Sequence, residues 1–203
     1  MSSFVGHALA GLGVHVTSQP LQKPALRDLL WPGWLVFVSL APDLDYLIPT
    51  LYALRASLDG GLRITHSLAG CLVFPILTIL ALSRLKLKPA TRRLYGIQVC
   101  LAGLSHVAMD MLVGVWPLPL LWPFTARRFE LPFGVLPSAA SFRLDNVYLY
   151  RNLLIELGVI VPLFSGVYLA RFSKLPALKR YGCAAALWLC SVGFMVWAFT
   201  LAR

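Results

Sequence analysis

The chain has 203 residues, of which 59% are hydrophobic and 13% are charged, and its mean hydropathy is +0.76. This composition excludes an ordinary soluble domain and predicts an all-α, polytopic transmembrane helical bundle, which we expect as a multi-pass protein of the inner (cytoplasmic) membrane. The net charge of +10 does not indicate nucleic-acid binding, because lysine and arginine lie between the apolar runs, where they set membrane topology and meet anionic lipid headgroups.

The apolar runs predict about five full spans, preceded by a short N-terminal membrane-embedded helix, in a single domain of residues 1–203. We expect the short helix over residues 4–16 and the full spans over 29–54, 66–85, 94–115, 148–172 and 181–201. Residues 19–28 and 55–65 are polar connections, and residues 116–147 form a long connection whose start, rich in proline and aromatic residues, is expected at the membrane interface. Region 4–124 is predicted to carry a metal site, and spans 148–201 complete the bundle.

The distribution of basic residues predicts an orientation. The connections over 84–93 and 171–180 are the most basic, so we place both in the cytoplasm. Counting about 1.5 Å per helical residue from the span edges then places the ionisable residues of five segments in the outer half of the membrane.

Two carboxylates, Asp43 and Asp45, lie inside an apolar run that is long enough to span a bilayer. A charge at the centre of a membrane helix costs roughly 2.5–3.5 kcal/mol on insertion scales, so a cation, proton or buried partner has to offset this cost. The shared depth points to a cluster of these aspartates with the following residues: His7, His66, His106, Asp110 and Glu156. The alternative is a structural ion pair of the aspartates with Arg63 or Arg151.

Local spacing supports a site for one or two metal ions. His106 and Asp110 are four residues apart and share one helix face. Asp43 and Asp45 point apart on a regular helix, but the flanking Pro42 favours an unwound segment that turns both inward. Histidine nitrogen with carboxylate oxygen suits zinc first, and also manganese or iron. We predict that His7, Asp43, Asp45, His66, His106 and Asp110 are the metal ligands.

Four short motifs occur in order: Gly6-His7, Ala41-Pro42-Asp43-Leu44-Asp45, Arg63-Ile64-Thr65-His66-Ser67 and Ser105-His106-Val107-Ala108-Met109-Asp110. With the later Trp122-Pro123-Phe124, they resemble the LexA-regulated, membrane-bound metal-dependent hydrolase family of bacteria and archaea. The resemblance implies a helical membrane protein with a His/Asp metal centre and hydrolase activity. Leu62 departs from the family, which often has a histidine at this position.

The expected function is metal-dependent hydrolysis of a phosphoester or phosphodiester in a membrane lipid or lipid-linked substrate. Asp43, Asp45 or Glu156 would act as general base, and Arg63 would stabilise developing charge. The same residues also suit a transporter or a proton- or cation-binding protein, which remains the alternative. An acyl transferase is less well matched, because the spacing from His106 to Asp110 is one residue short of HxxxxD.

Overall fold

The computed structural model describes residues 2–19, 29–46, 48–50, 53, 61–138 and 145–201. Two parts of the predicted connections lie outside the described residues, namely residues 20–28 of the connection 19–28 and residues 55–60 of the loop 55–65. The elements are α1 (Phe4–Ser18), α2 (Leu30–Leu40), η2 (Ala41–Tyr46), η3 (Ile64–His66), α4 (Leu68–Arg84), α5 (Pro89–Val113), α6 (Val147–Phe172) and α7 (Ala177–Thr200). The all-helical prediction is confirmed for this part of the chain.

Among the described residues, three helices are long and apolar enough to cross a membrane, namely α5, α6 and α7. The helix α4 is apolar but has only 17 residues. The predicted count of about five full spans is therefore not confirmed. The coarser prediction, a multi-helix membrane protein with a shorter N-terminal helix, agrees with the structure.

The predicted interruption at the two aspartates is confirmed. The helix α2 has 11 residues, about 16 Å at 1.5 Å per residue, which is well short of the roughly 30 Å of a bilayer core. Pro42 has no N–H to donate to the preceding helical turn, so regular α-helical hydrogen bonding stops here. The Ala41 N–H bonds to the Val38 carbonyl, and the chain continues as the 3₁₀ helix η2 through Asp43 and Asp45.

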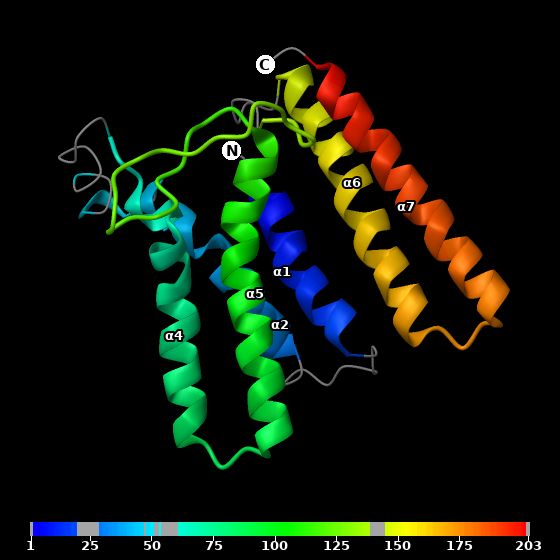
Figure 1. Ribbon diagram of the computed structural model, residues 1–203, viewed down its shortest axis with the longest axis horizontal. Helices are drawn as coiled ribbons and strands as arrows, with labels where there is room; N and C mark the ends of the chain where they lie inside the picture. Colours follow the sequence, from blue (N-terminus) through cyan, green and yellow to red (C-terminus); the bar gives the residue numbers. More distant parts are fainter. Residues whose placement is uncertain are drawn as a thin grey trace.

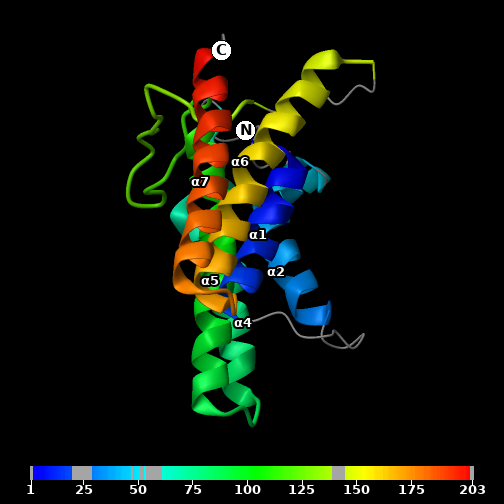
Figure 2. The same cartoon turned by 90° about the vertical axis from the view of Figure 1, so that its right-hand side faces the viewer.

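The helix α1 lies at the centre of the bundle, where it packs against α2, α5 and α6, while α4 packs on α5 and α7 on α6. Figures 1 and 2 show α4 and α5 on one side of α1 and the α6–α7 hairpin on the other. Small residues allow these close contacts: a Cβ on Gly11 would lie 2.6 Å from Ser39 Oγ of α2, and one on Gly103 would lie 2.8 Å from Pro75 Cγ of α4.

The two ends of the bundle differ in character. At the upper end in Figure 1, α1, α4 and α6 begin, α5 and α7 end, and the long connection after α5 crosses above the helices. The short basic connections 85–88 and 173–176 lie at the opposite end. The predicted metal ligands belong to the first turn of α1, to η2, to η3 directly before α4, and to the last turns of α5, so the fold gathers them at the upper end.

Candidate metal centre

Five ionisable side chains from four elements converge near the upper end of the bundle. They are His7 of α1, Asp43 of η2, His66 of η3, and His106 and Asp110 of α5. Each of these residues is 3% exposed or less. Two overlapping groups, His7–Asp43–His106 and His66–His106–Asp110, place one ligand atom from each member within 4.8 Å of the others. The predicted convergence of His7, Asp43, His66, His106 and Asp110 is therefore what the structure shows.

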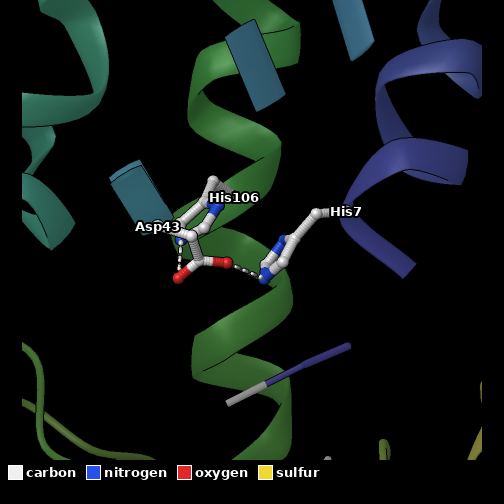
Figure 3. Close-up of side chains that lie close together, drawn as sticks. All are labelled: His7, Asp43 and His106. Atoms are coloured by element: carbon white, nitrogen blue, oxygen red, sulfur yellow. Dashed lines mark ion pairs between the residues drawn. The ribbon is translucent and has the colours of Figure 1, made fainter. Parts of the chain in front are cut away.

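Figure 3 shows the Asp43 carboxylate facing the imidazoles of both His7 and His106, with one oxygen toward each ring. Its Oδ2 lies 3.9 Å from His7 Nε2, and its Oδ1 lies 3.9 Å from His106 Nε2. The rings of His7 and His106 stack with their centroids 3.9 Å apart. The two rings thus present their Nε2 atoms side by side toward the same carboxylate.

His66 and Asp110 complete the cluster. His66 Nε2 is 3.2 Å from Asp43 Oδ1 and 3.6 Å from Asp110 Oδ2. Asp110 also lies 3.5 Å from His7 Nε2 and 3.6 Å from His106 Nε2. Metal–ligand bonds of about 2.0–2.2 Å place neighbouring ligand atoms of one ion roughly 3–4 Å apart. All six histidine–carboxylate separations fall within this range, so each of the two overlapping groups of three has the spacing of a metal site.

A backbone carbonyl fixes the orientation of His106. His106 Nδ1 lies 2.7 Å from the carbonyl oxygen of Ser39 and donates to it, which leaves Nε2 of the neutral ring with a lone pair facing the cluster. The Ser39 hydroxyl in turn donates to the His7 carbonyl, at 2.8 Å. A histidine held through its other nitrogen in this way is typical of metal ligands.

Several buried polar atoms of the cluster lack a hydrogen-bond partner. Both ring nitrogens of His7, Nε2 of His106 and Oδ2 of Asp110 are in this position. A buried polar group without a partner costs roughly 1–3 kcal/mol, so a set of them at one point is destabilising unless something binds there. Lone pairs converging at one point have the chemistry of a cation site.

Asp45, a predicted ligand, is held mainly by Arg63. The guanidinium donates from Nε to Oδ2 at 2.9 Å and from Nη2 to Oδ1 at 2.8 Å, while Thr65 Oγ1 donates to Oδ2 at 3.2 Å. Arg63 also reaches Asp43 Oδ1, at 3.4 Å. Burial alone lowers the pKa of Arg63, but the hydrogen bonds and charge of Asp45 outweigh this effect and hold the pKa above its usual value. Asp45 lies beside the cluster, 3.9 Å from His66 Nδ1, and outside the two convergent groups.

Glu156 also lies outside those two groups, although it is buried. Its carboxylate accepts hydrogen bonds from the hydroxyls of Ser2 and Ser3 and from the Ser3 N–H, the last at 3.0 Å. Ser2 in turn donates its N–H to Asp110 Oδ1, at 2.9 Å. The predicted catalytic role of Glu156 therefore stays a prediction, and its described contacts are with the start of α1.

The remaining candidates have structural contacts. Ser67 and Ser105 donate to backbone carbonyls three residues earlier, and Arg151 bonds to the side chain of the adjacent Asn152. Leu62, at the position of a family histidine, is buried. His15 contacts Gln19 near the opposite end of α1 and belongs to neither convergent group.

Sequence reasoning missed four residues that support the site: Ser2, Ser3, Ser39 and Thr65. Ser3 had a detectable signal, because a serine directly before an apolar run is a typical helix N-cap, and its hydroxyl accepts from the Gly6 N–H. Ser39 contacts His106 through its backbone carbonyl, which leaves no trace in the choice of residue, and His7 through its hydroxyl.

The comparison with known protein families agrees with the helical fold. The family model described as YdjM inner membrane protein matches residues 1–201. Neither a curated protein nor a solved structure matches the chain. The match supports the membrane family that the sequence motifs indicated, and it is silent on hydrolysis. Together with the apolar helices, it shows that this multi-pass protein of the inner membrane belongs to the YdjM inner membrane protein family.

Proposed function

We propose that the protein is an integral membrane metal-dependent hydrolase that acts on a phosphoester or phosphodiester of a lipid or lipid-linked substrate. The observation that carries the proposal is the buried convergence of three histidines and two aspartates with several unpartnered polar atoms. In a purely structural ion pair, those atoms would have hydrogen-bond partners. A metal ion instead needs atoms whose lone pairs are free to bind it.

The charges support at least one divalent ion. Asp43, Asp45 and Asp110 carry three negative charges, and Arg63 offsets one of them. Glu156, also buried and linked to Asp110 through Ser2, adds a further negative charge. Burying the remaining negative charge uncompensated would be strongly unfavourable, and one or two divalent cations would offset most of it.

The ligand set suits zinc, manganese or iron, because it offers imidazole nitrogen and carboxylate oxygen. Five protein ligands exceed the three or four of a typical zinc site. Manganese and iron therefore need testing beside zinc, which we expected first. His7, Asp43, His66, His106 and Asp110 would hold the ion.

A bound ion of this kind acidifies water and polarises a phosphoryl oxygen. The chain would supply the remaining functions. Any Asp43 oxygen not bound to the ion is placed to accept a proton. Asp45 is less suited to this role, because Arg63 and Thr65 together donate three hydrogen bonds to it. The side chain of Arg63 is 11% exposed, whereas the neighbouring ligand side chains are 5% exposed or less. Arg63 would therefore be the charged group closest to an incoming anionic headgroup. It would stabilise the developing negative charge.

The position of the site supports a lipid substrate. His106 lies seven residues before the end of α5, which corresponds to about 10 Å of helix. We propose that the short helices α1, α2 and α4 are embedded beside the three spans. The basic connections 85–88 and 173–176 would then contact anionic lipid on the cytoplasmic side, with the site toward the outer face.

A substrate screen in proteoliposomes tests the hydrolase proposal. Purified protein loaded with zinc, manganese or iron(II) would be incubated with phospholipids and polyprenyl phosphates, and the products read by mass spectrometry. We expect metal-dependent release of a headgroup or phosphate that is abolished in Asp43→Asn. A full complement of metal without turnover of any such lipid would contradict it.

The second candidate is a transporter or cation-binding protein. The burial of all five ligands, each 3% exposed or less, favours it, because a hydrolase must also admit substrate. Uptake of metal ions or protons by the same proteoliposomes, lost in Asp43→Asn, would support this candidate.

A further inference from the structure

Glu156 is the one ionisable residue among the predicted site residues that comes from α6. It is 2% exposed and contacts the first residues of α1. Three donors meet its two oxygens: the hydroxyls of Ser2 and Ser3 and the Ser3 N–H. These donors take three of the roughly four lone-pair sites of the carboxylate, which leaves it little capacity to bind a metal ion.

Ser2 connects this carboxylate to the metal centre. Its hydroxyl donates to Glu156, and its N–H donates to Asp110 Oδ1, at 2.9 Å. The other oxygen, Asp110 Oδ2, lies 3.6 Å from both His66 Nε2 and His106 Nε2. Ser2 therefore holds Asp110 Oδ1, which also lies 3.5 Å from His7 Nε2, while Oδ2 faces His66 and His106.

The fit between α1 and α6 at this point is tight. A Cβ added to Gly6 would fall on the Glu156 carboxylate and lie 2.7 Å from the Ser2 hydroxyl. Gly6 is next to His7, so the approach that seats Glu156 also positions a predicted ligand. Glycine is needed here for close approach and not for its backbone angles, because α1 is helical at this residue.

We propose that Glu156 is a positioning residue, which orients Asp110 and His7 for metal binding through Ser2, Ser3 and the start of α1. This inference rests on the proposed metal site. It gives α6 a function in the centre although α6 supplies no ligand. It also replaces the general-base role expected for Glu156, because a carboxylate with three donors on it is poorly placed to accept a further proton.

Metal affinity of four variants tests the inference: Glu156→Ala, Glu156→Gln, Gly6→Ala and the control Ser191→Ala. Ser191 is also buried and donates to the Val159 carbonyl of α6, but it lies outside the network. The dissociation constant for zinc and manganese would be measured by chelator competition on monodisperse, detergent-purified protein. Thermal unfolding of each sample confirms that it is folded at the assay temperature.

Loss of a hydrogen-bonding partner outside the ligand shell typically weakens metal binding 10–100-fold. We expect a weakening of about this size in Glu156→Ala and Gly6→Ala, with unchanged stoichiometry at saturation. Glu156→Gln keeps most of the affinity, because the amide oxygen still accepts from serine and its NH₂ donates to the other hydroxyl. Ser191→Ala binds like the wild type.

Wild-type affinity in Glu156→Ala overturns the positioning role. Loss of stoichiometric binding at saturation also overturns it and makes Glu156 a ligand. Equal weakening in Glu156→Gln and Glu156→Ala overturns it in favour of a purely electrostatic effect. A wild type that binds no metal is a separate result, because it removes the proposed metal site itself.

Discussion

At the residue scale, the centre combines two kinds of carboxylate. Asp43 and Asp110 face the histidine Nε2 atoms, whereas Asp45 is occupied by the two-pronged hydrogen bonds of Arg63. The Asp45–Arg63 pair lies at the rim of the cluster, where the Arg63 guanidinium also covers the Tyr46 ring at 4.3 Å. This arrangement separates the residues that would hold the ion from the residue that would meet the substrate.

The Arg63–Asp45 pair makes a stability prediction. Removing one partner of a buried ion pair typically costs about 3–5 kcal/mol, because the other charge is left buried without compensation. Arg63→Ala should therefore lower the free energy of unfolding in detergent by about this amount, reduced somewhat because Arg63 is partly accessible. The double variant Asp45→Ala/Arg63→Ala should lose less unfolding free energy than the two single variants lose when their losses are added. Arg127→Ala, which alters an exposed arginine, serves as the control, and additive single effects would show that the pair is not coupled.

At the element scale, the helix contacts are made by residues without bulky side chains. Gly11 of α1 faces Ser39 and Leu35 of α2, and Ser39 accepts from the His106 ring and donates to the His7 backbone carbonyl. The packing of α1 on α2 therefore connects two histidines that come from different helices. The site depends on this interface as much as on its ligands.

Gly11→Ala tests the interface. The new methyl group would lie 2.6 Å from Ser39 Oγ and 2.8 Å from the Leu35 carbonyl oxygen, so α1 and α2 must separate. We expect a loss of about 1–3 kcal/mol in unfolding free energy, with weaker metal binding. Gly193→Ala is the matched control, because its Cβ meets nothing within 4 Å and alanine favours a helix. Equal stability of the two variants would contradict the packing described here.

Local spacing predicted part of this site, and long-range packing decided the rest. His106 and Asp110 share a helix face by their separation alone, and Pro42 indicated the unwound segment that carries Asp43. The contacts of Glu156 with Ser2 and Ser3 join residues more than 150 positions apart, and nothing local distinguishes those serines from an ordinary cap. Asp45 likewise satisfied every sequence criterion for a ligand, and only the position of Arg63 distinguishes it from Asp43.

At the scale of the whole molecule, the bundle separates a polar centre at one end from basic connections at the other. The connections 85–88 and 173–176 lie opposite the end where α1, α4 and α6 begin (Figure 1). By the positive-inside rule, we propose that the centre lies toward the outer face. This arrangement suits a site that meets lipid headgroups from the outer leaflet.

Cysteine accessibility in cells tests this orientation. In a background without the native cysteines, Lys86→Cys should be protected from a membrane-impermeant maleimide, and Glu130→Cys in the long connection after α5 should be labelled. Both residues are exposed, so burial does not explain a difference between them. Labelling of Lys86→Cys alone would invert the topology and place the centre near the cytoplasm.

The measurement that tests the central claim most directly is the metal content of purified protein, comparing the wild type with His106→Ala, Asp43→Ala and His15→Ala. His15 is the matched control, because it is a histidine of α1 outside the cluster. We predict one or two equivalents of a transition metal in the wild type and in His15→Ala, because the buried carboxylates need a cation, and none in the other two variants. An absence of metal from every sample after incubation with zinc, manganese and iron(II), or its retention in His106→Ala, would contradict the account.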